Sequence, residues 1–76
     1  MLKVNIKLYD YNGYFIREWT EEFETSEQRM QYVERMERAY WRNLLEVTCI
    51  NREGNVTGWY KTTKQDVLNF VNSWDK

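Results

Sequence analysis

Hydrophobic and polar residues alternate strictly at the start of the chain. Residues 2–9 carry leucine, valine or isoleucine at even positions and lysine, asparagine or tyrosine at odd ones. A period of two residues predicts a half-buried β-strand. Asn12 and Gly13 follow, and this pair is typical of a two-residue type I′ hairpin turn. We therefore expect the chain to return as a second, antiparallel strand.

A turn centred on Asn12 and Gly13 determines which residues of the two strands pair. Apolar residues then meet on the inner face and opposite charges meet on the outer face, which favours this register. The predicted pairs are Leu2–Phe23 and Ile6–Trp19 on the inner face, Lys3–Glu22 and Lys7–Glu18 on the outer face, and Tyr9–Ile16 and Tyr11–Tyr14 near the turn.

The next segment predicts an amphipathic helix. The run Thr25-Ser26-Glu27-Gln28 has the spacing of a capping box, in which the first side chain and the fourth each bond the other's main-chain amide. A helix is expected from there to about Arg42. Its apolar face consists of Tyr32, Val33, Met36, Ala39 and Tyr40, at the spacing that a helix needs to pack on a sheet.

Residues 44–50 and 56–61 predict a second hairpin. A loop at Glu53 and Gly54 sets Glu46 opposite Lys61 and Val47 opposite Tyr60, whereas a loop one residue later would shift the pairing. We prefer the first register. It directs Tyr60 inward and Trp59 outward, because neighbours in a strand point to opposite faces.

A second capping-box pattern, Thr62-Thr63-Lys64-Gln65, opens a short helix near the end of the chain. Val67, Phe70, Val71 and Trp74 then recur at the spacing of an amphipathic core stripe. The elements together predict an α+β fold of order ββαββα. Two β-hairpins form a four-stranded antiparallel sheet with two helices packed on one face. We expect residues 1–76 to be a single compact domain, and the strand order stays open.

The two halves of the chain share small similarities. Asn12-Gly13 corresponds to Gly54-Asn55 at the turns, and both helices begin with a threonine-rich cap. Since capping chemistry alone can produce the second of these, an internal duplication stays open.

Composition narrows the function further. Aromatic residues make up 17% of the chain, histidine is absent, and Cys49 is the only cysteine. Because histidine is the usual general base and metal ligand near neutral pH, its absence argues against ordinary catalysis, and we expect no enzyme activity, metal or cofactor. Cys49 lies at an inward strand position and is expected to be a core residue. Without a signal-like or membrane-spanning stretch, we expect a cytoplasmic protein.

Several aromatic residues exceed what the predicted core needs. We expect a protein-binding surface at the first turn, with further anchors on the fourth strand and on the margin of the first helix. Its residues are Tyr9, Tyr11, Tyr14, Phe15, Trp59 and Trp41. In size and composition only, the chain is similar to phage or mobile-element inhibitors of host defence, such as anti-CRISPR proteins. That resemblance implies a larger partner, such as a host nuclease or defence complex, blocked sterically.

Two alternatives from other classes stay open. A basic strip on the first helix could bind nucleic acid, with Trp41 and Trp59 stacking on bases; its residues are Arg35, Arg38, Arg42, Lys61 and Lys64. A net charge of −1 gives no general attraction to phosphates. The other alternative is a homo-oligomeric structural module, for example a homodimer.

Overall fold

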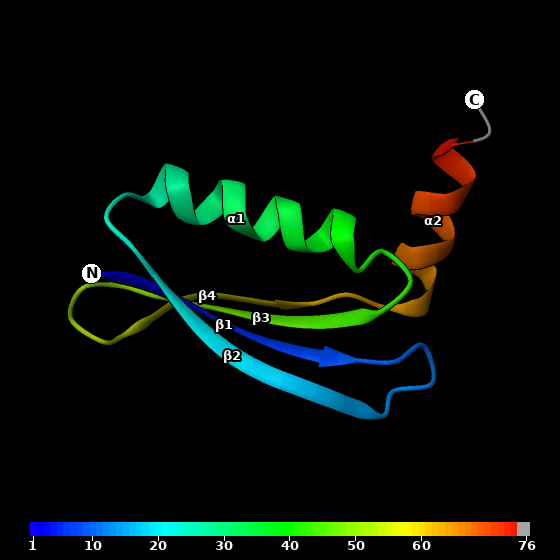
Figure 1. Cartoon of the computed structure of the whole chain (residues 1–76), viewed down its shortest axis with the longest axis horizontal. Coiled ribbons are helices and arrows are strands. Elements are labelled where there is room, and N and C mark those ends of the chain that lie inside the picture. The colour runs from blue at the N-terminus through cyan, green and yellow to red at the C-terminus, as the bar shows by residue number, and fades with distance from the viewer. Residues whose placement is uncertain (75–76) are drawn as a thin grey trace.

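Two β-hairpins lie side by side and join through their first strands, forming one sheet (Figure 1). The computed structural model describes residues 1–74, and side chains in this range except at positions 70, 71, 73 and 74. The elements are β1 (Leu2–Tyr9), β2 (Phe15–Phe23), α1 (Ser26–Ala39), β3 (Leu44–Ile50), β4 (Val56–Lys61) and α2 (Lys64–Trp74). All strand pairs are antiparallel and the order is β2-β1-β3-β4. The predicted α+β class and ββαββα order are confirmed.

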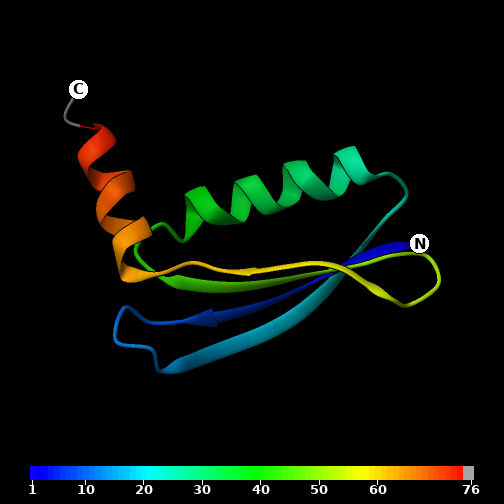
Figure 2. The same ribbon diagram turned by 180° about the vertical axis from the view of Figure 1, so that it is seen from behind.

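The helices lie on one side of the sheet, as Figures 1 and 2 both show. α1 runs across the sheet, whereas α2 stands at its end and rises beside the C-terminal end of α1. Val67, the first member of the predicted stripe on α2, is buried. The side chains of Phe70, Val71 and Trp74 lie outside the described residues.

The hydrophobic core lies between α1 and the two central strands. Val4, Ile6 and Leu8 of β1 pack with Leu45 and Val47 of β3 and with one helix residue. Among the described residues the buried cluster is Val4, Ile6, Leu8, Val33, Leu45 and Val47. Partly buried rings surround this cluster, and the Trp19 indole N–H donates to the Tyr32 hydroxyl at 2.7 Å. Tyr32, Val33, Met36 and Tyr40 pack here as the helical pattern predicts.

The first hairpin confirms the predicted register along most of its length and corrects it near the turn. Leu2–Phe23, Lys3–Glu22, Ile6–Trp19 and Lys7–Glu18 pair as expected. Tyr9, however, pairs with Phe15 and not with Ile16, after a register shift between Leu8 and Tyr9. A bulge at Ile16 therefore separates two registers within β2.

The turn explains that shift. The N–H of Gly13 donates to the Asp10 carbonyl, and the N–H of Asp10 donates to the Tyr14 carbonyl. Among the described residues only Gly13 and Gly54 have positive φ, with Gly13 at 93°. Asn12 therefore cannot be in the type I′ conformation that we predicted. Asp10 holds a longer, three-residue loop instead, because its carboxylate accepts the N–H groups of Asn12 and Tyr14, each at 2.9 Å. The expected Tyr11–Tyr14 pair is likewise wrong.

The second hairpin repeats this arrangement. Asn51 accepts the N–H groups of Glu53 and Asn55 through its side chain, and Gly54 has a φ of 88°. The preferred pairs Glu46–Lys61 and Val47–Tyr60 are confirmed, and a register shift follows Cys49. The corresponding positions are thus Asp10 with Asn51 and Gly13 with Gly54, and not the Asn12-Gly13 and Gly54-Asn55 pairs expected from sequence.

The end of α1 and the start of α2 each differ from the predicted position. The capping box of Thr25 and Gln28 is confirmed, but α1 ends at Ala39 because Tyr40 leaves helical geometry (φ −116°, ψ 38°). The second capping box joins Thr63 to Asp66, one residue later than predicted. Thr62 is not available as a cap, since its hydroxyl accepts the N–H of Leu45 at 2.7 Å in the sheet.

These turns predict different costs for substitution of the glycines. Gly13→Ala and Gly54→Ala should each lower the free energy of unfolding by about 1 kcal/mol, because alanine is strained at positive φ. Gly58→Ala is the matched control: its φ is not in that region, and an added Cβ would meet only the Cys49 Cβ, at 3.8 Å. Urea unfolding of the three variants measures the difference. Equal losses at all three positions would contradict the proposed turn geometry.

Candidate functional site

The face of the sheet opposite α1, here called the outer face, is covered by no other element among residues 1–74 (Figures 1 and 2). One charged side chain from each strand contributes to a row of alternating charge across this face. Glu18 of β2 pairs with Lys7 of β1, Lys7 with Glu46 of β3, and Glu46 with Lys61 of β4. Neighbours of opposite charge stabilise an antiparallel sheet modestly, so this face is stable in contact with water.

Glu46 is the centre of the outer face. One carboxylate oxygen accepts the Tyr9 hydroxyl at 3.1 Å, and the other accepts the Trp59 indole N–H at 2.9 Å. The Lys7 ammonium lies 4.0 Å away. These contacts, with the Trp59 hydrogen bond foremost, hold the pKa of Glu46 below its ordinary value. Glu46 thus links Tyr9 of β1 to Trp59 of β4, two strands that are not neighbours in the sheet.

Tyr9 is the next member of this cluster. The Phe15 ring meets it edge-on, with centroids 5.9 Å apart, and the Lys61 ammonium lies 5.0 Å from its centroid. Partial burial, and then the hydrogen bond to Glu46, raises the pKa of the Tyr9 phenol, which keeps it a proton donor. The contact with Phe15 follows from the bulge, because the uninterrupted register would have put Ile16 here.

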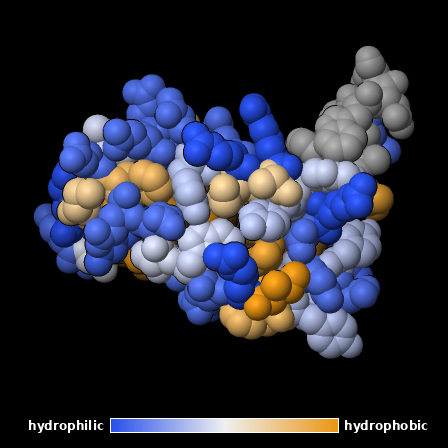
Figure 3. Space-filling model, viewed as in Figure 1, coloured by the Kyte–Doolittle hydropathy of each residue, from blue (hydrophilic) through white to orange (hydrophobic). Residues whose placement is uncertain are grey.

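The adjoining turn extends this aromatic region. Tyr14 is 72% exposed, and Phe15 and Trp59 are each 58% exposed. Tyr11 is also exposed, and the Lys64 ammonium lies 5.2 Å from its ring centroid. We define the outer aromatic surface as Tyr9, Tyr11, Tyr14, Phe15 and Trp59. On the side of the molecule seen in Figure 3, apolar residues interrupt the hydrophilic surface toward the β1–β2 turn.

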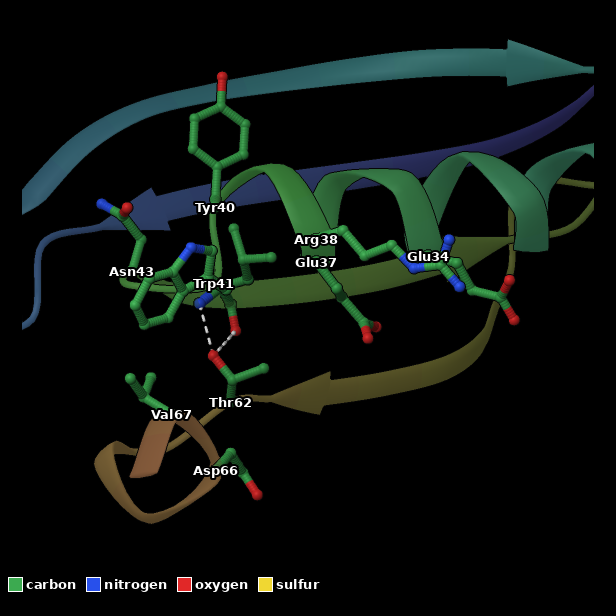
Figure 4. A pocket seen from close by; sticks show the side chains of 10 residues that line it. Glu34, Glu37, Arg38, Tyr40, Trp41, Asn43, Thr62, Asp66 and Val67 are labelled. Carbon is green, nitrogen blue, oxygen red and sulfur yellow. Dashed lines mark hydrogen bonds between the residues drawn. The ribbon is translucent and has the colours of Figure 1, made fainter. Parts of the chain in front are cut away.

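Trp41, the sixth aromatic residue expected to bind a partner, lies apart from the outer aromatic surface. It follows α1 and lines a cavity of about 270 Å³ between the end of α1 and the start of α2 (Figure 4). The Arg42 guanidinium lies 4.7 Å from its ring centroid. Across this cavity stand Thr62, bonded to Leu45, and Val67 (Figure 4).

The structure separates the residues of the expected basic strip. Arg35 and Arg38 lie on α1, and Arg42 lies just beyond it. Lys61 contacts Tyr9 on the outer face, and Lys64 contacts Tyr11 near the turn. Arg35 and Arg38 therefore lie on the helix side of the sheet, whereas Lys61 lies on the outer face and Lys64, at the start of α2, lies beside Tyr11.

Glu46 is a functional candidate that the sequence pattern did not indicate, since the pattern predicts it only as a partner of Lys61. The available signal was its outward position in the alternating run from Leu44 to Ile50. Its contacts with Tyr9 depend on the pairing of β1 with β3, which no local pattern reveals.

The described residues offer little other chemistry. Cys49 is a free thiol, half-buried against the core. Within residues 1–74, histidine, cysteine, aspartate and glutamate form no group of three that could hold a metal ion. None of the helices in this range has the length and apolar character needed to cross a membrane.

No known protein family, curated protein or solved structure matches this chain.

The contacts of Glu46 predict a pH-dependent contribution to stability. Glu46→Gln should lower the free energy of unfolding at pH 7 by about 1 kcal/mol, since it weakens charge-assisted hydrogen bonds. Because the folded pKa is depressed, this contribution is present above the ordinary value of about 4.3 and disappears as pH falls through the folded pKa. Urea unfolding from pH 7 to pH 3 should show the two proteins converge.

The exposed turn residue Glu53 supplies the control, because its side chain has no partner in this cluster. Glu53→Gln should follow the wild type at every pH. A constant difference between Glu46→Gln and the wild type across the whole range would contradict the assigned role of the charge.

Proposed function

We propose that this chain is a non-enzymatic protein-binding module and that the outer aromatic surface is its contact surface. The supporting observation is a sheet face that no other element of residues 1–74 covers and that presents Phe15 and Trp59 more than half exposed. Soluble domains rarely expose such side chains together unless a partner covers them, and aromatic residues are enriched in protein interfaces.

The cluster around Glu46 supports this proposal because it holds the rings in place. Trp59 and Tyr9 are each fixed by a hydrogen bond to the same carboxylate, and Phe15 packs on the Tyr9 ring. Rings that are already ordered lose little conformational entropy on binding. The alternating charges of Glu18, Lys7, Glu46 and Lys61 form a row across the same face and supply polar contacts beside the aromatic anchors.

The charge distribution favours a protein over a nucleic acid. Each lysine of the central row lies next to a glutamate, and the arginines of α1 lie on the other side of the sheet. A phosphate chain on the outer face would meet carboxylates as often as ammonium groups. The mechanism that we propose is steric: the module covers a working surface of a larger protein, such as a host defence protein.

A capture experiment tests the contact surface. The chain is immobilised, exposed to bacterial lysate, and expected to retain one protein in stoichiometric amount. Tyr14→Ser combined with Phe15→Ser should reduce capture at least about tenfold, because central aromatic anchors commonly contribute 2 kcal/mol or more. Both side chains are exposed, so the fold should persist in circular dichroism. The matched control is Leu68→Ser on α2, a residue that is 46% exposed and is not one of the five that define this surface.

Two outcomes would contradict the proposal. One is undiminished capture by a folded double variant. The other is capture that disappears after nuclease treatment or falls steeply with added salt, which would identify nucleic acid as the ligand.

A further inference from the structure

β4 is an edge strand with little protection against pairing. It borders β3 alone in the order of the described strands. The opposite edge, β2, carries four charged residues, whereas β4 (VTGWYK) carries Lys61 alone. Charges on edge strands normally prevent further pairing. The composition of β4 therefore favours the addition of another strand.

The main chain of β4 has hydrogen-bonding groups directed away from the sheet. The N–H of Thr62 donates to the Leu45 carbonyl, and Tyr60 and Gly58 continue this ladder opposite Val47 and Cys49. Because antiparallel residues alternate between the two sides of a strand, the N–H and C=O groups of Trp59 and Lys61 point outward. They offer a partner strand two donors and two acceptors.

A groove runs along β4 on the inner side of the sheet. It has a volume of about 420 Å³, and α1 forms its other wall; the residues that line it are Ser26, Arg29, Met30, Val33, Glu34, Glu37, Cys49 and Tyr60. Figure 2 shows β4 along the near edge with α1 running above it. Gly58 pairs with Cys49, which lines the groove, and as a glycine it adds no side chain beside Cys49; an added Cβ there would meet the Cys49 Cβ at 3.8 Å. An edge strand beside a helix-walled groove is the geometry by which extended peptides are bound as an added strand.

The charges of the groove indicate what it would accept. Glu34 and Glu37 project from α1 toward the β4 side (Figure 4), and Glu37 accepts the Tyr60 hydroxyl. Burial of the ring and this hydrogen bond raise the pKa of Tyr60. Among the described residues that line the groove, the basic one is Arg29, which donates to the carbonyls of Lys3 and Ile50 at the far end. The end near Tyr60 therefore carries two carboxylates, Glu37 beside Tyr60 and Glu34 with Arg38 next to it, and the middle, near Met30 and Cys49, is apolar.

We propose that β4 binds an extended segment of a partner protein as a fifth, antiparallel strand. The segment places a lysine or arginine beside Tyr60 and Glu37 and, two residues later, a large apolar side chain over Gly58. This order follows because an antiparallel partner passes Tyr60 before it passes Gly58. The inference rests on the proposed protein-binding function and specifies the partner's binding segment.

A second copy of the chain fits this edge poorly. Its own β4 would bring Tyr60 and Gly58 to the groove, and its one charged residue, Lys61, faces the outer side against Tyr9. The β4 strand of a second copy therefore brings no basic side chain to Glu34 and Glu37. A basic segment of another protein satisfies both the main chain and the acidic wall.

Synthetic peptides test the inference. The probe is a seven-residue peptide with capped termini that has arginine at position three, phenylalanine at position five and threonine elsewhere. In one control peptide glutamate replaces the arginine. In the other the arginine and the phenylalanine are exchanged. Titration into the isotope-labelled chain should shift the amide resonances of β4 and slow hydrogen exchange at Trp59 and Lys61. Each control peptide should bind about tenfold more weakly, as expected for loss of one charge-assisted contact.

Protein variants separate main-chain pairing from side-chain contacts. Lys61→Pro removes an outward N–H without removing a bond to β3, and Lys61→Ala removes the same side chain but keeps the N–H. We expect Lys61→Pro to bind the probe about tenfold more weakly than Lys61→Ala. Equal binding by these two variants, unchanged exchange at Trp59, or equal affinity for all three peptides would overturn the inference.

Two further results bear on the same proposal. Protection of Trp59 without peptide, together with a dimer in sedimentation, would overturn it in favour of a second copy. Loss of lysate capture with Lys61→Pro but not with Lys61→Ala would support it. Tyr14 and Phe15 do not line the groove. If the peptide experiment fails, the capture experiment with the Tyr14 and Phe15 variants therefore still tests the outer aromatic surface.

Discussion

The structure depends on one apolar contact, the packing of α1 against the central strands β1 and β3. Val4, Ile6, Leu45 and Val47 are fully or almost fully buried there. A chain of 76 residues buries only a modest share of its surface, and its helices lie on one side of the sheet. The outer face must therefore be stable in water, and charge pairs with bonded aromatic side chains provide that stability.

The repeated turns determine which side chains meet on the outer face. Asp10 and Asn51 each hold a three-residue loop, and each loop is followed by a register shift in the returning strand. The first shift brings Phe15, and not Ile16, beside Tyr9. A carboxylate at the start of a turn thus changes the chemistry of a surface several residues away, because a one-residue shift moves side chains to new neighbours.

β4 joins the two surfaces to which we assign binding roles. Trp59 and Tyr60 are neighbours that point to opposite faces, and each is bonded to a glutamate from another element: Glu46 of β3 for Trp59 and Glu37 of α1 for Tyr60. These bonds order the edge strand from both sides. A strand ordered in advance loses less entropy when a partner pairs with it.

Local patterns in the sequence determined the elements, most strand pairs within each hairpin and the inward helix face, because periodicity and capping act over a few residues. They placed each turn one residue too late in the chain. The side chains of Asp10 and Asn51 accept main-chain N–H groups and so fix a different turn, and the sequence pattern does not reveal these bonds. Tertiary structure alone decided the strand order, the separation of Lys61 from the arginines of α1, and the central position of Glu46. The physical reason is separation along the chain: Tyr9 and Glu46 are 37 positions apart, and only the burial of β1 against β3 brings them into contact.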